Sequence, residues 1–221
     1  VSAAIFKAYD IRGIVETALT EEAVSAIGLA LGAKARARGI GQVVVGRDGR
    51  LSGPALARAL SAGLCAAGVD VIDIGMVPTP LVYFATVLTG CGTGVAVTGS
   101  HNPPEYNGLK MMLGGATLHG EDIRDIAATL ADPARYAALF AATPGTVRTL
   151  DVVPDYIARI AGEVKLARPL KVVVDAGNGV AGAVAPALLR ALGITDLTEL
   201  YCEVDGHFPN HHPDPAHPEN L

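Results

Sequence analysis

Apolar residues recur along the chain with the periods of helices and of short buried strands. Apolar positions three and four apart, often closed by glycine or opened by proline, predict helices at residues 21–38, 54–67, 81–88 and 121–130. Short apolar runs predict strands at residues 43–45, 69–74, 94–97 and 109–113. Strands that alternate with helices need crossover connections, so this pattern predicts an α/β fold with a mixed, mostly parallel sheet flanked by helices.

The periodic pattern weakens between residues 132 and 149, where Pro133, Pro144 and Gly145 interrupt it. We therefore expect a complete first domain at residues 1–146 and part of a second, similar α/β domain at residues 147–221. The elements expected in this second part are helices at residues 152–160 and 180–192, strands at residues 171–175 and 197–203, and a loop from residue 206 onward.

Composition narrows the class of protein. Half of the residues are hydrophobic and 18% are charged, which is typical of a well-packed globular chain. A net charge of -5 argues against a nucleic-acid partner. Cys65, Cys91 and Cys202 lie far apart, which favours neither a disulfide framework nor a zinc site. We find no membrane-spanning apolar run and no signal peptide, so we expect a cytoplasmic protein with a small-molecule partner and no membrane contact.

The strongest polar segment, residues 98–110, directly follows a predicted strand and reads TGSHNPPEYNGLK. Its serine, Ser100, lies at the carboxyl end of that strand, where open α/β sheets usually bind their ligands. Gly99 and Pro103 restrict the conformation of the loop. For a serine taken alone, the commoner case is a polar turn in which Ser100 and Asn102 bond only the nearby backbone.

Two more segments, residues 7–13 and 46–52, also carry several charges close to a glycine. Loops at strand ends of one sheet can converge, and a local basic pocket on an acidic protein would concentrate a phosphorylated substrate. The expected pocket contains Lys7, Arg12, Arg47, Arg50, His101 and Lys110. Each of these taken singly is more often a solvated surface residue, and for Arg50 we expect solvent exposure.

The segments KAYDIRG, GRDGRLS and TGSHNP, in this order, resemble the motifs of the α-D-phosphohexomutase superfamily. The likeness runs from about Lys7 to Asn220. Gly99 and the tail segment at residues 208–215, FPNHHPDP, are most similar to the bacterial phosphomannomutase/phosphoglucomutase branch.

This resemblance implies an intramolecular phosphotransferase that interconverts hexose 1-phosphate and hexose 6-phosphate, with mannose or glucose as the sugar. A phosphorylated Ser100 would give its phosphoryl group to the free hydroxyl, and the hexose 1,6-bisphosphate would return the other phosphate. Mg²⁺ is the implied cofactor, with an oxygen of the phosphorylated Ser100 as one ligand.

The resemblance also implies roles for individual residues. Lys110, Arg12 and His101 join Ser100 in the implied catalytic set. Tyr9, Arg12, Lys110 and Asn102 form the implied substrate-binding set. Family members are longer and have further domains that supply the other Mg²⁺ ligands and contact the sugar, so we expect this chain to need the C-terminal domains and to be inactive alone.

Two other functions remain open from the residues themselves. The strand expected at residues 171–175 leads into a Gly-x-Gly-x-x-Gly turn from Gly177 to Gly182, a pattern typical of NAD-binding oxidoreductases. Phosphohexomutases carry the same turn without a nicotinamide cofactor. The chain could also be a non-catalytic module that binds sugar phosphates, although such a module need not retain Ser100 and Lys110.

Overall fold

The structure is a computed structural model that describes residues 1–214, 216 and 218. Its main part is a seven-stranded sheet with the strand order β1-β5-β4-β2-β3-β7, and β6 pairs with β5. Strands β4, β2, β3 and β7 run parallel, whereas β5 is antiparallel to both β4 and β1. The strands are β1 Ile11–Ile14, β2 Gln42–Arg47, β3 Asp70–Met76, β4 Gly94–Val97, β5 Tyr106–Leu113, β6 Ala116–Thr117 and β7 Val147–Thr149. The expected mixed, mostly parallel sheet is confirmed.

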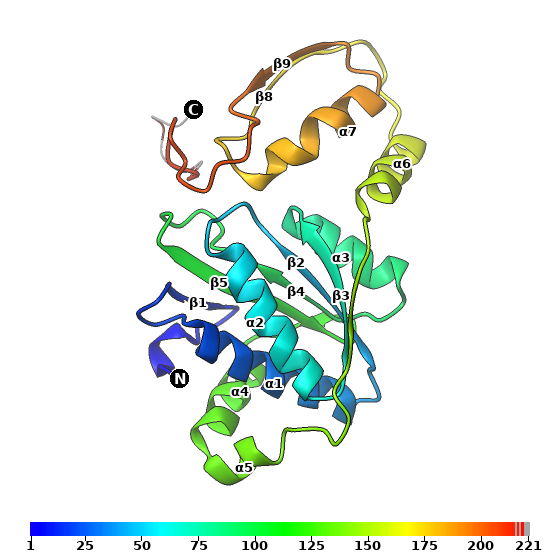
Figure 1. The fold of residues 1–221 in the computed structure, drawn as a ribbon. Coiled ribbons are helices and arrows are strands. Elements are labelled where there is room, and N and C mark those ends of the chain that lie inside the picture. Colours follow the sequence, from blue (N-terminus) through cyan, green and yellow to red (C-terminus); the bar gives the residue numbers. More distant parts are fainter. Residues whose placement is uncertain (215, 217, 219–221) are drawn as a thin grey trace.

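Helices cover both faces of this sheet (Figure 1). They are η1 Ala3–Ile5, α1 Glu21–Ala37, α2 Gly53–Ala66, α3 Thr79–Leu88, α4 Glu121–Ala131 and α5 Pro133–Ala137. Side chains alternate across a strand, so successive residues of one strand pack on opposite faces of the sheet. In β2, Val43 and Val45 pack with α1 and α2, whereas Val44 packs with α3 on the other face.

The second domain lies beyond the carboxyl ends of β2 and β4, in the upper part of Figure 1. It contains α6 Val153–Glu163, β8 Lys171–Asp175, η2 Val180–Ala183, α7 Ala185–Ala191 and β9 Asp196–Leu200. Its two strands are parallel. Val184 joins Val152 in the core beneath α3, and the rings of Tyr156 and Phe84 meet edge to face at 5.3 Å. The second domain therefore rests on the α3 side of the first.

Most of the expected elements are present, with boundaries that differ by a few residues. The charged segment at residues 7–13, which we expected to be a strand-end loop, runs into the edge strand β1 at Ile11–Ile14. The helix expected at residues 180–192 is divided at Val184 into the 3-10 turn η2 and the short helix α7. Strand β7 pairs with β3 of the first sheet although it follows residue 146, so we propose that the second domain starts after Thr149.

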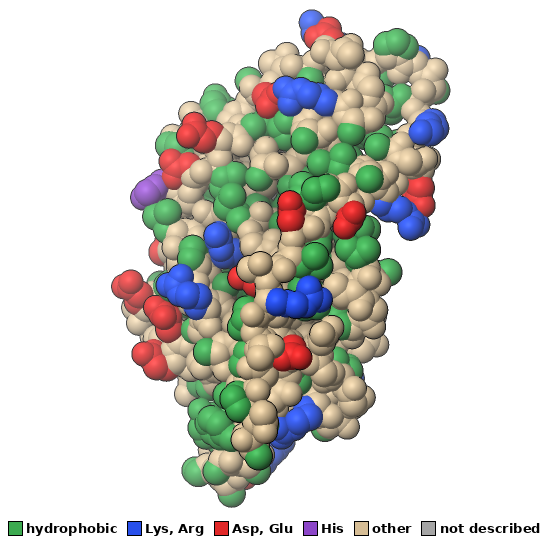
Figure 2. All heavy atoms as spheres, turned by 45° about the vertical axis from the view of Figure 1, so that its right-hand side comes forward, with side chains coloured by type: hydrophobic (Ala, Val, Ile, Leu, Met, Phe, Trp, Pro, Cys, Tyr) green, Lys and Arg blue, Asp and Glu red, His purple; other side chains and the backbone are tan. Residues whose placement is uncertain are grey.

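Basic and acidic side chains are interspersed on the face of the molecule that Figure 2 shows. No helix among the described residues is long and apolar enough to cross a bilayer.

Helices α1 and α2 approach each other closely because glycines lie at their contact. A Cβ atom on Gly63 of α2 would come within 1.9 Å of the Ser25 carbonyl oxygen, and one on Gly28 of α1 would come within 2.4 Å of the Leu60 carbonyl oxygen. Backbone atoms cannot move aside as the end of a side chain can. The short distance between the two helices is thus set by residues without side chains.

We expect Gly63→Ala to lower the free energy of unfolding by about 1–2 kcal/mol. Overpacking of a tight contact costs about 1–3 kcal/mol, which exceeds the gain of up to about 1 kcal/mol from the higher helix propensity of alanine. Urea titration followed by circular dichroism would measure the change.

Gly162→Ala in α6 is the matched control, because a Cβ atom there meets nothing within 4 Å. This variant should keep or slightly raise the stability. Equal effects of the two substitutions would contradict the tight contact at Gly63.

Candidate functional site

Two loops of the first domain meet because their strands are neighbours in the sheet. Strands β2 and β4 are parallel and paired, with Arg47 opposite Val97 at their carboxyl ends. The loop at residues 48–52 after β2 therefore lies against residues 98–105 after β4. We call residues 98–105 the serine loop.

Asp48 anchors the start of the serine loop. Its Oδ2 atom accepts hydrogen bonds from Thr98 Oγ1 at 2.7 Å and from the Gly99 amide at 3.2 Å. The Ser100 amide in turn donates to Thr98 Oγ1 at 2.9 Å. These bonds hold Ser100 in a left-handed conformation with φ of 54°, which is unusual for a residue other than glycine. Such strained residues cluster at functional sites, and Ser100 is exposed to solvent.

Arg50 lies beneath the serine loop, and our expectation that it is solvent-exposed is wrong. Its side chain is 1% exposed. Its two terminal nitrogens donate to four carbonyl oxygens of the loop and its end, those of Ser100, Asn102, Pro103 and Tyr106, at 2.6–3.0 Å. Burial lowers the pKa of the guanidinium, and the nearby Asp48 carboxylate opposes that effect. Arg50 thus binds protein backbone and is not available to a substrate.

Arg12 and Lys110 lie on one face of the sheet, opposite the α1 and α2 side. In the antiparallel pair β1-β5, Arg12 is opposite Gly108, and Lys110 is two residues farther along β5. The alternating neighbours Leu109 and Met111 belong to the core on the other face. Both basic side chains remain partly exposed, and Arg12 forms an ion pair with Asp10.

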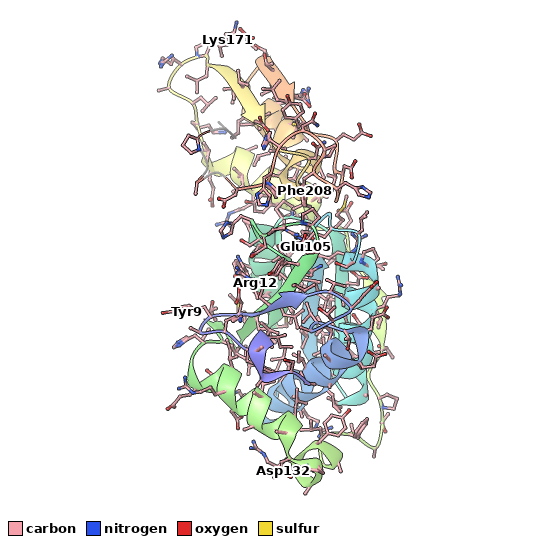
Figure 3. The ribbon with its side chains drawn as sticks, turned by 90° about the vertical axis from the view of Figure 1, so that its left-hand side faces the viewer. Tyr9, Arg12, Glu105, Asp132, Lys171 and Phe208 are labelled. Carbon is pink, nitrogen blue, oxygen red and sulfur yellow. The ribbon has the colours of Figure 1, made fainter. Side chains whose placement is uncertain are left out.

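A surface hollow beside this face gathers part of the expected site. Lys7, Tyr9, Arg12 and Asn102 are among the residues that line it. Tyr9 is 75% exposed and projects from the edge of the molecule (Figure 3). Asn102 is also used within the serine loop, because its side-chain amide donates to the Gly99 carbonyl at 2.8 Å. The charged residues that line the hollow are Lys7, Arg12 and Asp10, which leaves one positive charge in excess and suits an anionic ligand.

Two members of the expected basic pocket lie elsewhere. His101 faces the second domain, where its Nδ1 is 3.3 Å from Asp214 Oδ2. Arg47 lines a different hollow, together with Arg58 and residues of α2. With Arg50 buried, three of the six expected residues remain as candidate anion-binding groups. Lys7 and Arg12 line the hollow, and Lys110 shares the sheet face of Arg12 without being one of the lining residues.

The glycine turn after β8 is occupied by the chain itself. A Cβ atom on Gly182 would come within 2.1 Å of the Cys202 carbonyl oxygen, so its absence allows the segment after β9 to pack there. The side-chain amide of Asn178 donates to the Glu203 carbonyl oxygen at 2.9 Å. The ring of His211 lies over Gly177, and its Nε2 is 3.1 Å from Asp175 Oδ1. These contacts fill the place above the turn and favour a packing role over dinucleotide binding.

The electrostatics of His211 fit this packing role. One ring nitrogen lies 3.0 Å from the His212 carbonyl oxygen and the other lies near Asp175. The bond to the His212 backbone, and then the Asp175 carboxylate, raise the pKa of His211 because both favour the protonated ring.

The chain matches a known family over both of its domains. Residues 3–136 match "Phosphoglucomutase/phosphomannomutase, alpha/beta/alpha domain I". The chain belongs to this family. Residues 154–221 match the corresponding domain II, so the phosphohexomutase resemblance of the three motifs is confirmed.

Individual relatives agree with this membership. A phosphoglucomutase from Neisseria gonorrhoeae is 53% identical over 217 residues, which are 98% of this chain and 46% of the relative. A phosphomannomutase/phosphoglucomutase from Pseudomonas aeruginosa is 50% identical over 219 residues, which are 99% of this chain and 46% of that relative. The chain spans about half the length of the relatives it matches.

A solved structure has the same fold. The phosphoglucomutase/phosphomannomutase family protein from Burkholderia thailandensis superimposes with a TM-score of 0.93 at 52% identity, over all of this chain and 49% of that structure.

Sequence reasoning missed the structural importance of Asp48, Arg50 and Phe208. The sequence pattern assigned no role to Asp48, and Phe208 entered only through the tail motif. The sequence did contain a signal for this close contact, because Gly49 lies in the loop after β2 and Gly99 lies in the serine loop. Close backbone approach is a common reason for such glycines.

We expect Asp48→Asn to lower the free energy of unfolding by about 3–5 kcal/mol. The substitution preserves shape but removes the carboxylate charge that lies 3.3 Å from the buried Arg50 Nε, and an unpaired buried charge carries a cost of this size. Chemical denaturation would measure it.

Asp132→Asn is the matched control, because Asp132 caps α5 at an exposed position and asparagine caps equally well. Its stability should change by no more than about 0.5 kcal/mol. A similarly small effect at Asp48 would show that its charge is not needed to bury Arg50.

Proposed function

We propose that this chain supplies the first two domains of an intramolecular phosphotransferase that interconverts hexose 1-phosphate and hexose 6-phosphate. Ser100 carries the phosphoryl group, and a hexose 1,6-bisphosphate is the intermediate. Mannose and glucose phosphates are the proposed substrates. Family membership supports this reaction class, and the geometry around Ser100 supports the role of that residue.

The single observation that carries the proposal is the placement of Ser100. It is exposed, at the carboxyl end of a central parallel strand, and it has a left-handed backbone conformation fixed from Asp48. A polar turn that only satisfies its own backbone does not need a buried arginine and a carboxylate beneath it. The same organisation also disfavours a passive sugar-phosphate module, which needs no prepared serine.

The proposed transfer breaks one bond and forms another. The free hydroxyl oxygen of the hexose monophosphate attacks the phosphorus on Ser100 as the bond from phosphorus to Oγ breaks. Overall the sugar hydroxyl loses its proton and Oγ gains one, so the hexose carries two phosphates and Ser100 becomes a free hydroxyl. In the second transfer Ser100 Oγ attacks the other phosphorus of the bisphosphate, the bond from that phosphorus to the sugar oxygen breaks, and the sugar oxygen gains the proton that the serine loses, which restores the phosphoserine and releases the isomeric monophosphate.

Lys110 and Arg12 have the charge that this reaction requires. Negative charge is spread over the oxygens of the transferring phosphoryl group, so fixed cations stabilise the transition state. We assign this role to Lys110, which could also assist proton transfer, and to Arg12. Tyr9 and Asn102 line the hollow and would contact the sugar phosphate, and Lys7 would help hold the phosphate.

His101 has a weaker claim to a direct role. Its ring lies beside Asp214 of the second domain, so its imidazole is directed away from the hollow. We retain it in the proposed site as a neighbour of the phosphoserine and not as a proton acceptor for it.

Magnesium, which the resemblance implies, needs several oxygen ligands. An oxygen of a phosphorylated Ser100 would supply one. Among the described residues no group of three or more His, Cys, Asp or Glu side chains could hold a metal ion. These residues do not make a complete magnesium site, so the steps above involve the chain's own side chains alone.

The test of this function needs the full-length form, by which we mean this chain joined to the C-terminal half that its relatives contain. We expect the full-length form, incubated with labelled glucose 1,6-bisphosphate, to carry the label on Ser100 and to convert glucose 1-phosphate to glucose 6-phosphate. Phosphopeptide mapping and a coupled assay would measure the two results.

Ser100→Ala should lose both label and turnover, whereas Ser52→Ala should keep the label. A label on Ser52 or Thr98 in the unaltered protein would remove Ser100 from its proposed role. Binding of the sugar phosphates without any labelling would favour the non-catalytic module.

Lys110→Ala in the full-length form should lower kcat by about 100- to 1000-fold and change KM little. Loss of one preorganised interaction with the transition state commonly has an effect of this size. Steady-state kinetics with glucose 1-phosphate would separate the two constants.

Lys165→Ala provides the control, because Lys165 is an exposed residue that donates to the Ala161 carbonyl in the second domain. A Lys110 variant with normal kcat and a raised KM would mean that Lys110 only binds substrate.

A further inference from the structure

The second domain contacts the first at the loop that contains Asp48 and Arg50. A Cβ atom on Gly49 would come within 2.2 Å of Val204 Cγ1. From the other side, a Cβ atom on Gly206 would come within 2.8 Å of the Leu51 amide nitrogen and 2.9 Å of the Gly49 carbonyl oxygen. The two segments therefore fit together only because glycine occupies both positions.

Phe208 covers Arg50 at this contact. Its ring centroid is 5.3 Å from the Arg50 Cζ atom, a distance typical of a cation-π interaction. Figure 3 shows Phe208 where the two domains meet, next to the end of the serine loop that carries Glu105. The backbone of Phe208 has φ of 53°, an unfavourable conformation for a bulky residue. Its turn is closed by the Phe208 amide, which donates to the Asp205 carbonyl at 3.0 Å.

The serine loop also packs closely on the side chain of Arg50. A Cβ atom on Gly99 would come within 2.3 Å of Arg50 Nε. Arg50 Nε lies 3.3 Å from Asp48 Oδ2, outside hydrogen-bond geometry, and it is the one buried side-chain nitrogen or oxygen in the described part of the chain without a hydrogen-bond partner. The terminal nitrogens are fully used by the loop carbonyls, so the guanidinium plane sets where those carbonyls lie.

A second contact links the same parts of the molecule. His101, the residue next to Ser100, lies 3.3 Å from Asp214 of the second domain. The serine loop is thus held from beneath by Arg50 and from the side by the tail of the second domain.

We propose that Arg50 is a positioning residue for Ser100 and that Phe208 couples it to the second domain. When the second domain is seated, the Phe208 ring keeps water from the guanidinium, and its terminal nitrogens donate to three carbonyls of the serine loop and to that of Tyr106 at the start of β5. When the Phe208 ring leaves, water competes for those bonds, and the backbone of Ser100 is held only by the bonds that start from Asp48. The catalytic part of this inference rests on the proposed function of Ser100, whereas the coupling itself does not.

The chemistry favours arginine at this position. A planar guanidinium presents several donors in a fixed arrangement and binds several carbonyl oxygens at once, whereas a lysine ammonium is compact and more strongly hydrated. Arg50→Lys would therefore keep the charge beside Asp48 but lose the arrangement that defines the loop.

The first test measures hydrogen exchange of the serine-loop amides in the full-length form. Phe208→Ala should raise their exchange by about tenfold, because the ring no longer shields the bonds that hold the loop. Phe208→Tyr should restore the slow exchange. Phe140→Ala is the control and should leave the exchange of the serine-loop amides unchanged. Phe140 is half-exposed, and its ring packs against that of Tyr136.

The second test measures kinetics in the same variants. Phe208→Ala and Arg50→Lys should lower kcat by about 10- to 100-fold with KM for glucose 1-phosphate nearly unchanged, since misplacement of a reacting group affects the transition state more than binding. Phe208→Tyr should recover the turnover, and Phe140→Ala should not lose it.

The outcomes separate this proposal from the proposed function. If the unaltered full-length form has no mutase activity, the proposed function fails and the exchange data still decide the coupling. Serine-loop exchange in Phe208→Ala equal to that of the unaltered protein would overturn the coupling. So would an equal rise of exchange throughout the second domain and the loop, because that result indicates general loss of stability.

Discussion

The serine loop depends on one buried cation. Arg50 has a side chain that is 1% exposed, yet it keeps its charge through a carboxylate on one side and four backbone carbonyl oxygens on the other. A charge removed from water is costly unless its hydrogen bonds are replaced. The loop replaces the hydrogen bonds that the guanidinium would make to water only when its carbonyl oxygens point at the guanidinium. That arrangement, together with the bonds from Asp48 to the start of the loop, fixes the left-handed backbone of Ser100.

Topology brings the partners of this cation together. Arg50 and Asp48 follow β2, Ser100 follows β4, and the two strands are adjacent and parallel. Strand β5 is antiparallel to β4, and β1 is antiparallel to β5, and these two strands extend the sheet with a face that carries Lys110 and Arg12. The candidate site therefore lies where the parallel centre of the sheet passes into its antiparallel edge. The buried arginine shapes the backbone of the serine loop, whereas the partly exposed Lys110 and Arg12 are basic side chains that solvent can reach.

Glycines occupy the positions at which this arrangement brings chain segments into close contact. The positions that would otherwise collide, Gly49, Gly99 and Gly206, all surround Arg50. The glycines of the turn after β8 have the same use, because Gly182 admits the backbone of Cys202 and Gly177 admits the ring of His211. Gly-x-Gly-x-x-Gly is thus compatible with a purely structural turn, and the local pattern alone does not distinguish the two uses.

The sequence by itself determined the alternation of helices and strands, the strand-end position of Ser100 and the family, because periodicity, turn residues and short motifs are local properties of the chain. It did not determine the neighbours of a charged side chain. From the sequence we expected Arg50 at the surface, Arg47 and His101 in one pocket, and a strand-end loop at residues 7–13. Only the tertiary structure placed Arg50 under the loop and Phe208 over Arg50, because these contacts join residues far apart in the chain. Burial and charge compensation depend on everything within a few ångströms, and a one-dimensional pattern does not contain that information.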